Sequence, residues 1–202
     1  AQWPALRGPN YDGLIHDGNP PVEWNEKKNI RWKTAIPGAG HASPVLWGDY
    51  LYVQTAVDVA LDDSLANRKY QYKLLAVHRS SGEITWQKTV REAVPAEDSH
   101  HQTATFASNT GITDGEHLYA FFGSQGLYCF DFDGNLKWEQ DFGDMRTRHS
   151  FGEGSSPAIH GNTLVINWDH EGDSFIVALD KRSGKELWRK ERDEPTSWST
   201  PL

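Results

Sequence analysis

Tryptophan recurs along this 202-residue chain at nearly equal intervals of about fifty residues. The four members of the series are 54, 52 and 50 residues apart: Trp32, Trp86, Trp138 and Trp188. A glycine stands four residues before each of the last three, at Gly82, Gly134 and Gly184. A fixed period of roughly 20 to 50 residues is typical of proteins built from copies of one supersecondary unit. The chain is therefore predicted to repeat a single small unit several times.

A second marker runs in phase with the tryptophans. A serine or threonine, followed by proline in three of four cases, opens an apolar stretch in each repeat: Ser43, Ser108, Ser156 and Thr200. Three markers that share one period and one phase are hard to obtain by accident. A β-sandwich with accidental periodicity is therefore the weaker alternative.

Each repeat has the pattern of four short strands joined by tight turns. In the first copy these are "SPVLW", "YLYVQT", "KLLAVHR" and "ITWQKTV". Gly82, Gly134 and Gly184 supply the positive φ that the turn before the fourth strand needs. The fourth strand alternates polar and apolar residues around its tryptophan, as a half-exposed outer strand does. No stretch has a helical period, so the sequence predicts an all-β propeller of four-stranded antiparallel blades.

The stretch "ALDKRSGKELW", 178–188, resembles the pyrroloquinoline-quinone-type (PQQ-like) β-propeller repeat, and "AVHRSSGEITW", 76–86, is a variant of it. The opening "WPALRGPNYDG" is similar to that of exported bacterial proteins labelled after the BamB-type outer-membrane assembly lipoprotein. The resemblance implies that Trp86, Trp138 and Trp188 dock between neighbouring blades. It also implies a ring of seven or eight blades, and one such fold hosts many functions.

The repeat count predicts about half of such a ring. Residues 1–29 are expected to be an N-terminal extension and 30–202 a partial propeller. Its parts are a closing strand at 30–34, blades at about 41–90, 105–143 and 153–192, and the start of a fourth blade at about 197–202. The remaining blades are expected from a missing C-terminal half; two half-rings that join from separate chains are the less favoured alternative.

The composition and the first residues of the chain bear on its binding partners and its cellular compartment. The net charge of −8 argues against a nucleic-acid partner, because phosphate binding needs clustered Lys and Arg. No apolar run reaches the roughly 18 residues of a transmembrane segment. The single cysteine, Cys129, lies in an apolar strand pattern and is expected to be packed rather than reactive. The start at Ala1 fits a mature exported protein, periplasmic or associated with the cell envelope, and also an artificial start.

The clearest candidate site is the end of the ring at which the inner strands begin. His41, Phe106, Glu153 and Trp198 are expected to converge there. Arg148 and His149 lead into the third inner strand, where Arg could clamp a carboxylate. Each of these interpretations has a structural alternative. The small residues beside the mouth side chains would merely allow neighbouring blades to approach closely at the axis. The arginines would pair with the acidic residues of "DHEGD", 169–173, rather than with a ligand.

No metal-binding or catalytic motif is recognised. Adjacent histidines, His100 and His101, point to opposite sides of an extended backbone, so a shared metal is geometrically awkward. Quinoprotein dehydrogenases of this fold use calcium, a catalytic Asp and often adjacent cysteines, and one Cys excludes that pair. The first hypothesis is thus a non-catalytic envelope propeller that binds a protein or polysaccharide. The alternative is an oxidoreductase that uses PQQ and Ca²⁺ on an alcohol or sugar.

Overall fold

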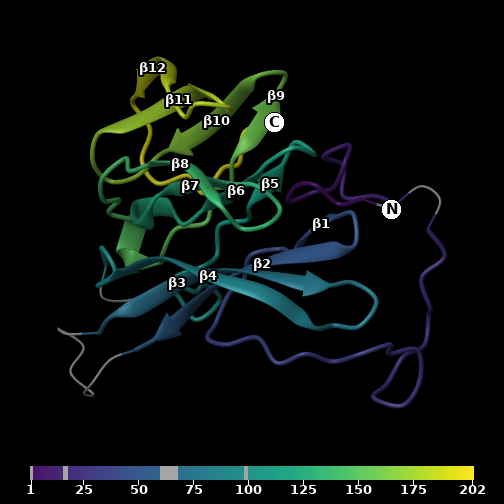
Figure 1. Cartoon of the computed structure of the whole chain (residues 1–202). Coiled ribbons are helices and arrows are strands. Elements are labelled where there is room, and N and C mark those ends of the chain that lie inside the picture. Colours follow the sequence, from purple (N-terminus) through teal and green to yellow (C-terminus); the bar gives the residue numbers. More distant parts are fainter. Residues whose placement is uncertain (1, 16–17, 60–67, 98–99) are drawn as a thin grey trace.

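Three four-stranded antiparallel sheets make up the molecule. The computed structural model describes residues 2–15, 18–59, 68–97 and 100–202 (Figure 1). The first sheet contains β1 (Val45–Trp47), β2 (Tyr50–Asp58), β3 (Tyr70–His78) and β4 (Ile84–Ala93). The second contains β5 (Ile112–Thr113), β6 (Leu118–Phe121), β7 (Leu127–Phe130) and β8 (Leu136–Gln140). The third contains β9 (Ala158–His160), β10 (Thr163–Trp168), β11 (Ser174–Asp180) and β12 (Glu186–Arg192).

The strands of each sheet are ordered as they occur in the chain, which is the order of a propeller blade. Figure 1 shows the sheets stacked in sequence, with β1, β5 and β9 toward the side where both termini lie. The described residues contain no α-helix, only the 3₁₀-helices η2 (Gly123–Gln125) and η3 (Arg148–Ser150). The predicted fold class is confirmed: the chain is a partial β-propeller. None of the described helices is long and apolar enough to cross a membrane.

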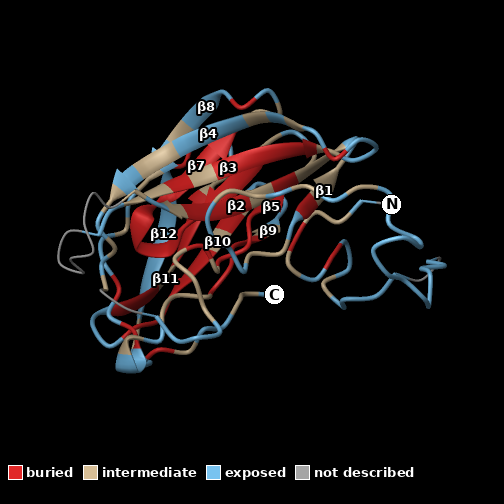
Figure 2. Ribbon diagram, turned by 90° about the horizontal axis from the view of Figure 1, so that it is seen from below, coloured by how far each residue is buried: buried red, intermediate tan, exposed pale blue. Residues whose placement is uncertain are grey.

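Burial follows position within the blade. Figure 2 shows the middle strands largely buried and the outer strands β4, β8 and β12 largely exposed. All seven residues of β12 are at least partly exposed, whereas β7 is buried along its whole length. The middle strands of the second blade, β6 and β7, contact a neighbouring blade on each face, so they carry apolar runs rather than a strict alternation.

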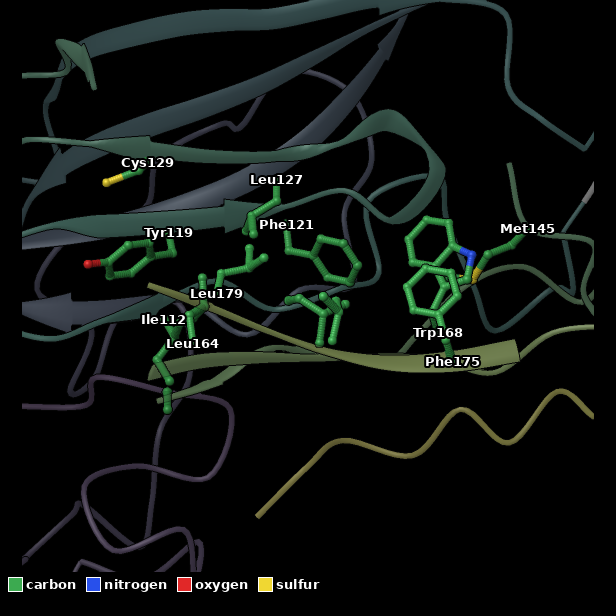
Figure 3. Close-up of a cluster of buried hydrophobic side chains, with 13 residues drawn as sticks. Ile112, Tyr119, Phe121, Leu127, Cys129, Met145, Leu164, Trp168, Phe175 and Leu179 are labelled. Carbon is green, nitrogen blue, oxygen red and sulfur yellow. The ribbon is translucent and has the colours of Figure 1, made fainter. Parts of the chain in front are cut away.

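The core consists of two clusters, each between a pair of neighbouring blades. One joins the first and second blades and includes Leu74 and Phe130. The other joins the second and third blades; in Figure 3, Tyr119 and Phe121 face Leu164 and Leu179, and Trp168 stacks on Phe175. Cys129 is fully buried in this second cluster, and burial raises the pKa of its thiol to about 12. It is thus a packed residue, not a thiolate nucleophile.

The first residues of the chain belong to the core, although the sequence assigns 1–29 to an extension. Trp3 exchanges two backbone hydrogen bonds with Leu46 and so lengthens the inner edge of the first blade. Thr113 of β5 donates its N–H to the carbonyl of Pro4, and Ala5 is buried in the cluster between blades two and three. Residues 3–5 therefore link the inner strands of neighbouring blades.

Serine and threonine hydroxyls connect the blades at the axis. The backbone N–H of Ser43 donates to the Thr110 hydroxyl, that of Thr110 to the Ser156 hydroxyl, and that of Ser156 to the Thr200 hydroxyl, at 2.9–3.0 Å. The repeat pattern of the sequence placed Ser108 in this series, and that placement is wrong by two residues. The Ser108 hydroxyl instead accepts the N–H of Thr105 in a local turn.

Candidate functional site

The inner strands begin at one end of the blades, which we call the mouth. The β2–β3 connections and the segments that follow β4 and β8 also lie at this end, because the strands are antiparallel. The tight turns that carry Gly82, Gly134 and Gly184 lie at the opposite end. The predicted candidates His41, Phe106, Arg148, His149, Glu153 and Trp198 all lie in mouth segments, but they form several local groups rather than one.

Phe106 and Glu153 line the same small cavity at the mouth, which measures about 30 Å³. Tyr72 of β3, Glu97, Asn109 and Gln125 of η2 complete its polar lining. Phe106 also contacts the rings of Tyr70, which is tilted, and His100, which is edge-on, with ring centroids 4.7 Å away in both cases. The cavity thus draws its walls from the first blade, the second blade and the segment that leads into the third.

The Glu153 carboxylate is held against the backbone of η2. It accepts the N–H of Ser124 at 2.8 Å and the Ser124 hydroxyl as well. Gly123 is required here, because a Cβ at this position would lie 1.3 Å from Glu153 Oε2. Burial, helped by the nearby carboxylates of Glu97 and Asp144, raises the pKa of Glu153 to about 7, although the hydrogen bonds from Ser124 lower it.

A wider groove of about 530 Å³ opens beside the cavity and shares Pro95, Ala96, Glu97 and Phe106 with it. Arg68, Arg146 and His149 lie along this groove. Arg68 is paired with Asp58, with 3.1 Å between Nε and Oδ2. Both oxygens of the Glu97 carboxylate accept hydrogen bonds from Thr147. The groove therefore combines the guanidinium groups of Arg68 and Arg146 with the aromatic rings of Tyr70 and Phe106.

Arg148 contacts the acidic segment of the third blade. Its Nε lies 3.6 Å from Glu171 Oε1, and Arg146 donates to the Glu171 carbonyl at 3.2 Å. Both arginines are exposed, so the ion pair adds little stability. Pairing with the "DHEGD" segment, one of the two alternatives from the sequence, is thus present in the structure for Arg148.

Trp198 lies at the mouth beside Phe151. The two rings are stacked, with centroids 6.4 Å apart, and they are 40 % and 41 % exposed. Trp198 Nε1 donates to the carbonyl of Gly152 at 2.7 Å. His149, Ser150 and Trp198 all have positive φ, and only two other non-glycine residues of the described chain do. Such backbone strain concentrates at functional sites, so this aromatic pair is a candidate contact surface.

The histidines predicted or considered at the mouth make local contacts. His41 Nδ1 lies 2.9 Å from the carbonyl of Thr103, and the His41 N–H bonds to Ala107 O. His100 contacts Phe106 edge to face and His101 lies tilted against Phe151, so the two rings belong to different aromatic groups. Asp98 and Ser99, which open the "DSHHQT" segment, lie outside the described residues.

The tryptophan series makes one repeated contact between blades at the end opposite the mouth. Trp86 Nε1 donates to the Phe132 carbonyl and Trp138 Nε1 to the Lys181 carbonyl, at 3.2 and 3.1 Å. Each ring covers the turn glycine of the following blade: Trp86 covers Gly134 and Trp138 covers Gly184. Gly82 is covered instead by Trp32, whose Nε1 donates to the Arg79 carbonyl. Residues 30–34, the predicted closing strand, thus lie along this turn and belong to no described strand.

The last member of the series lacks this contact. Trp188 is 47 % exposed, and its indole N–H has no hydrogen-bond partner among the described residues. The sequence could have identified Trp32 by its place in the series, but only the packing shows that it covers the first turn.

Asp114, Glu116 and His117 have potential ligand atoms within 4.8 Å of one another, at the β5–β6 turn. The Asp114 carboxylate is already saturated: it accepts both backbone N–H groups of Glu116 and His117, the Tyr119 hydroxyl and the Lys181 ammonium. Burial alone would raise the pKa of Asp114, but Lys181 and the two N–H groups lower it to about 2. The cluster is thus explained as a turn cap and an ion pair between blades.

Replacement of Asp114 by Asn is expected to destabilise the chain by roughly 2 kcal/mol at pH 7. Its folded-state pKa of about 2 lies below the unfolded value, so this stability is present above the unfolded pKa and is lost as pH falls through 2. Urea unfolding from pH 7 to pH 2 measures the difference. Asp49→Asn, at the exposed β1–β2 turn, is the matched control and should change little. An equal loss in both variants would contradict the assignment.

Sequence reasoning missed several polar residues of the mouth. Tyr72, Glu97, Asn109 and Gln125 line the cavity, yet they lie in four separate segments with no shared motif. The sequence suggested Asp169, within "DHEGD", as a partner for the arginines of 144–154. It forms instead a two-hydrogen-bond pair with Arg192, at 2.7 and 3.2 Å, and also accepts Asn167 and Ser197.

Comparison with known proteins gives one family match. The family model described as "Outer membrane protein assembly factor BamB" matches residues 71–201. None of the curated proteins matches the chain.

Several solved structures have a similar fold. A europium-containing methanol dehydrogenase superposes with a TM-score of 0.56 at 14 % identity, over 81 % of this chain and 27 % of that one. A quinohemoprotein alcohol dehydrogenase from Comamonas testosteroni gives 0.52 at 14 % identity, over 77 % of this chain and 21 % of that one. BamB from Moraxella catarrhalis gives 0.44 at 16 % identity, over 82 % and 55 %. The chain therefore spans about a quarter of the dehydrogenases, and the likeness shows the fold alone.

Proposed function

The chain belongs to the family of the outer membrane protein assembly factor BamB, and from this premise we propose that it is a non-catalytic propeller scaffold that binds a protein partner at its mouth. The observation that carries the proposal is the exposed, stacked pair of Phe151 and Trp198 on a strained backbone. Exposed aromatic residues on rigid elements are typical anchors of protein interfaces. A polysaccharide, which can also stack on aromatic rings, is an alternative outcome of the test.

The export of the protein and its place in the cell envelope are part of the same proposal. They are supported by the family. The contact of Trp86 and Trp138 with the turn glycines of the next blade supports a docking role for this series, in which Trp188 would contact a further blade. The position of Trp32 supports a ring-closing role for residues 30–34, completed by blades that lie beyond this chain.

The described mouth residues do not fit a calcium-and-quinone site. Among the described residues, the group of His, Cys, Asp and Glu side chains with ligand atoms in reach of one ion lies at the opposite end, at Asp114. Glu97 and Glu153 at the mouth accept hydrogen bonds from Thr147 and Ser124, and the described residues bring no third His, Cys, Asp or Glu ligand to them. The cavity beside them, about 30 Å³, is also far too small for a tricyclic quinone. An oxidoreductase therefore has less support than a scaffold.

Site-specific photocrosslinking tests the scaffold in the full-length protein. With a photoreactive amino acid in place of Phe151, we expect one dominant crosslinked protein, which Trp198→Ala greatly reduces. The same amino acid at Leu136, exposed on β8, is the control and should not give that product. Equal products at both positions would contradict the proposal. If no crosslinked product forms and the protein oxidises alcohols or sugars when PQQ and Ca²⁺ are added, the oxidoreductase function is the correct one.

A further inference from the structure

The small cavity at the mouth contains a buried acceptor that lacks a partner. Gln125 is 5 % exposed, and its Oε1 has no hydrogen-bond partner among the described residues. Tyr72, which is 1 % exposed, lines the same cavity. Buried polar groups are almost always hydrogen-bonded in native proteins. The Oε1 atom of Gln125 therefore indicates that a hydrogen-bond donor belongs in the cavity.

The charge around the cavity selects the kind of donor. The Glu153 carboxylate lines it together with Glu97, and neither has a cationic partner among the described residues. A cation placed here would be attracted by the Glu97 carboxylate and, above the Glu153 pKa of about 7, by the Glu153 carboxylate as well. Phe106, Phe122 and Tyr72 add aromatic rings to the lining, and such rings favour a cation over a neutral donor.

The size and the surroundings of the cavity define the rest of the ligand. About 30 Å³ admits one small group and not a whole molecule. The adjoining groove, about 530 Å³, shares Phe106, Pro95 and Ala96 with the cavity. These three apolar residues can contact an alkyl chain that leads from the groove into the cavity. A long alkyl stem with a small cationic end matches both spaces. A metal ion is less suitable, because the described residues group no three ligand atoms at this cavity.

We propose that the cavity takes the ammonium group of a lysine side chain from the protein partner, with the lysine methylenes over Phe106 and Pro95. The proposal rests on the scaffold function proposed above. An ammonium group has three donors, and Glu153, Gln125 and Tyr72 offer one acceptor each. Arg146 along the groove favours an acidic residue next to the lysine in the partner.

Binding of a minimal probe tests this assignment in the full-length protein. The probe is N-acetyl-lysine N-methylamide, and N-acetyl-norleucine N-methylamide has nearly the same stem without the ammonium group. Titration followed by NMR should show saturable binding of the lysine probe and none of the norleucine probe. Glu153→Gln should weaken binding by roughly tenfold or more, since it removes the charged acceptor. Tyr72→Phe, which keeps the ring, should weaken it by roughly threefold.

Controls separate this proposal from the scaffold function and from a metal site. Glu139→Gln, on the exposed face of β8, should leave binding unchanged, and thermal unfolding confirms that each variant folds. Equal binding of the two probes overturns the assignment, as does Ca²⁺ that binds in a Glu153-dependent way and displaces the lysine probe. If the Phe151 crosslink forms but the lysine probe does not bind, the lysine site alone fails. If the probe binds but no protein is crosslinked, the scaffold function fails instead.

Discussion

Trp138→Ala is expected to lower the free energy of unfolding of the 202-residue chain by about 3 kcal/mol, and Trp188→Ala by no more than about 0.5 kcal/mol. The two residues occupy the same position in successive repeats. Trp138 covers Gly184, contacts Tyr119 and donates to the Lys181 carbonyl, so its removal opens the joint between the second and third blades. Trp188 is half-exposed and has no such joint to lose among the described residues. Urea unfolding of both variants measures the difference.

The glycine on the other side of the joint provides an independent check. Gly184 has a φ of +70°, and a Cβ there would lie 2.7 Å from the Trp138 ring. Gly184→Ala should therefore destabilise the chain through the same joint, and the effects of the two substitutions should not add. Similar losses for Trp138→Ala and Trp188→Ala would refute the docking role. In a longer protein with a further blade, Trp188→Ala should become as costly as Trp138→Ala.

The second large effect is a loss of stability as pH rises, caused by Glu153. Its folded-state pKa is about 7, against about 4.5 in the unfolded chain, so the folded state holds the proton longer. Stability due to this group is complete below pH 4.5 and is lost as pH rises through 7, because the unfolded state then binds fewer protons. The total change is roughly 3 kcal/mol, since each pKa unit corresponds to about 1.4 kcal/mol.

Glu153→Gln should remove this slope, because an amide keeps a neutral group of nearly the same shape against Ser124. The variant is expected to exceed the parent in stability at pH 8 and to approach it at pH 5. Urea unfolding at half-unit pH steps gives the difference in stability between the two proteins, from which the contributions that both share cancel. Glu139→Gln, exposed on β8, serves as the control and should run parallel to the parent. A difference that does not depend on pH would show that Glu153 ionises normally in the fold.

The sequence period predicted the blades because each blade has the same kind of residue at equivalent positions. A glycine and a tryptophan equivalent to Gly82 and Trp86 occur in every repeat, and short apolar strands lie between one such pair and the next. Register at the axis was harder to predict: Ser108 and Thr110 both carry hydroxyls, and only packing shows that Thr110 accepts the Ser43 N–H. Composition alone does not distinguish two hydroxyl residues that are two positions apart on one extended segment.

The mouth was predicted only in outline. The sequence placed Phe106 and Glu153 at the same end, because both precede an inner strand. It could not show that Tyr72 and Gln125 join them, since these come from β3 and η2 and have no common spacing. Such a site depends on contacts between blades, and a repeat pattern describes only what the blades share.

The contact between a tryptophan and the glycine of the following turn also bears on how such a chain can grow. The two partners belong to different repeats: Trp86 to the first blade and Gly134 to the second. A tandem duplication of one repeat therefore creates a complete new joint at once, since the copied tryptophan meets a copied glycine. Loss of one whole repeat likewise leaves a tryptophan opposite a glycine. This division allows gene duplication to change the number of blades without inventing a new interface at each step.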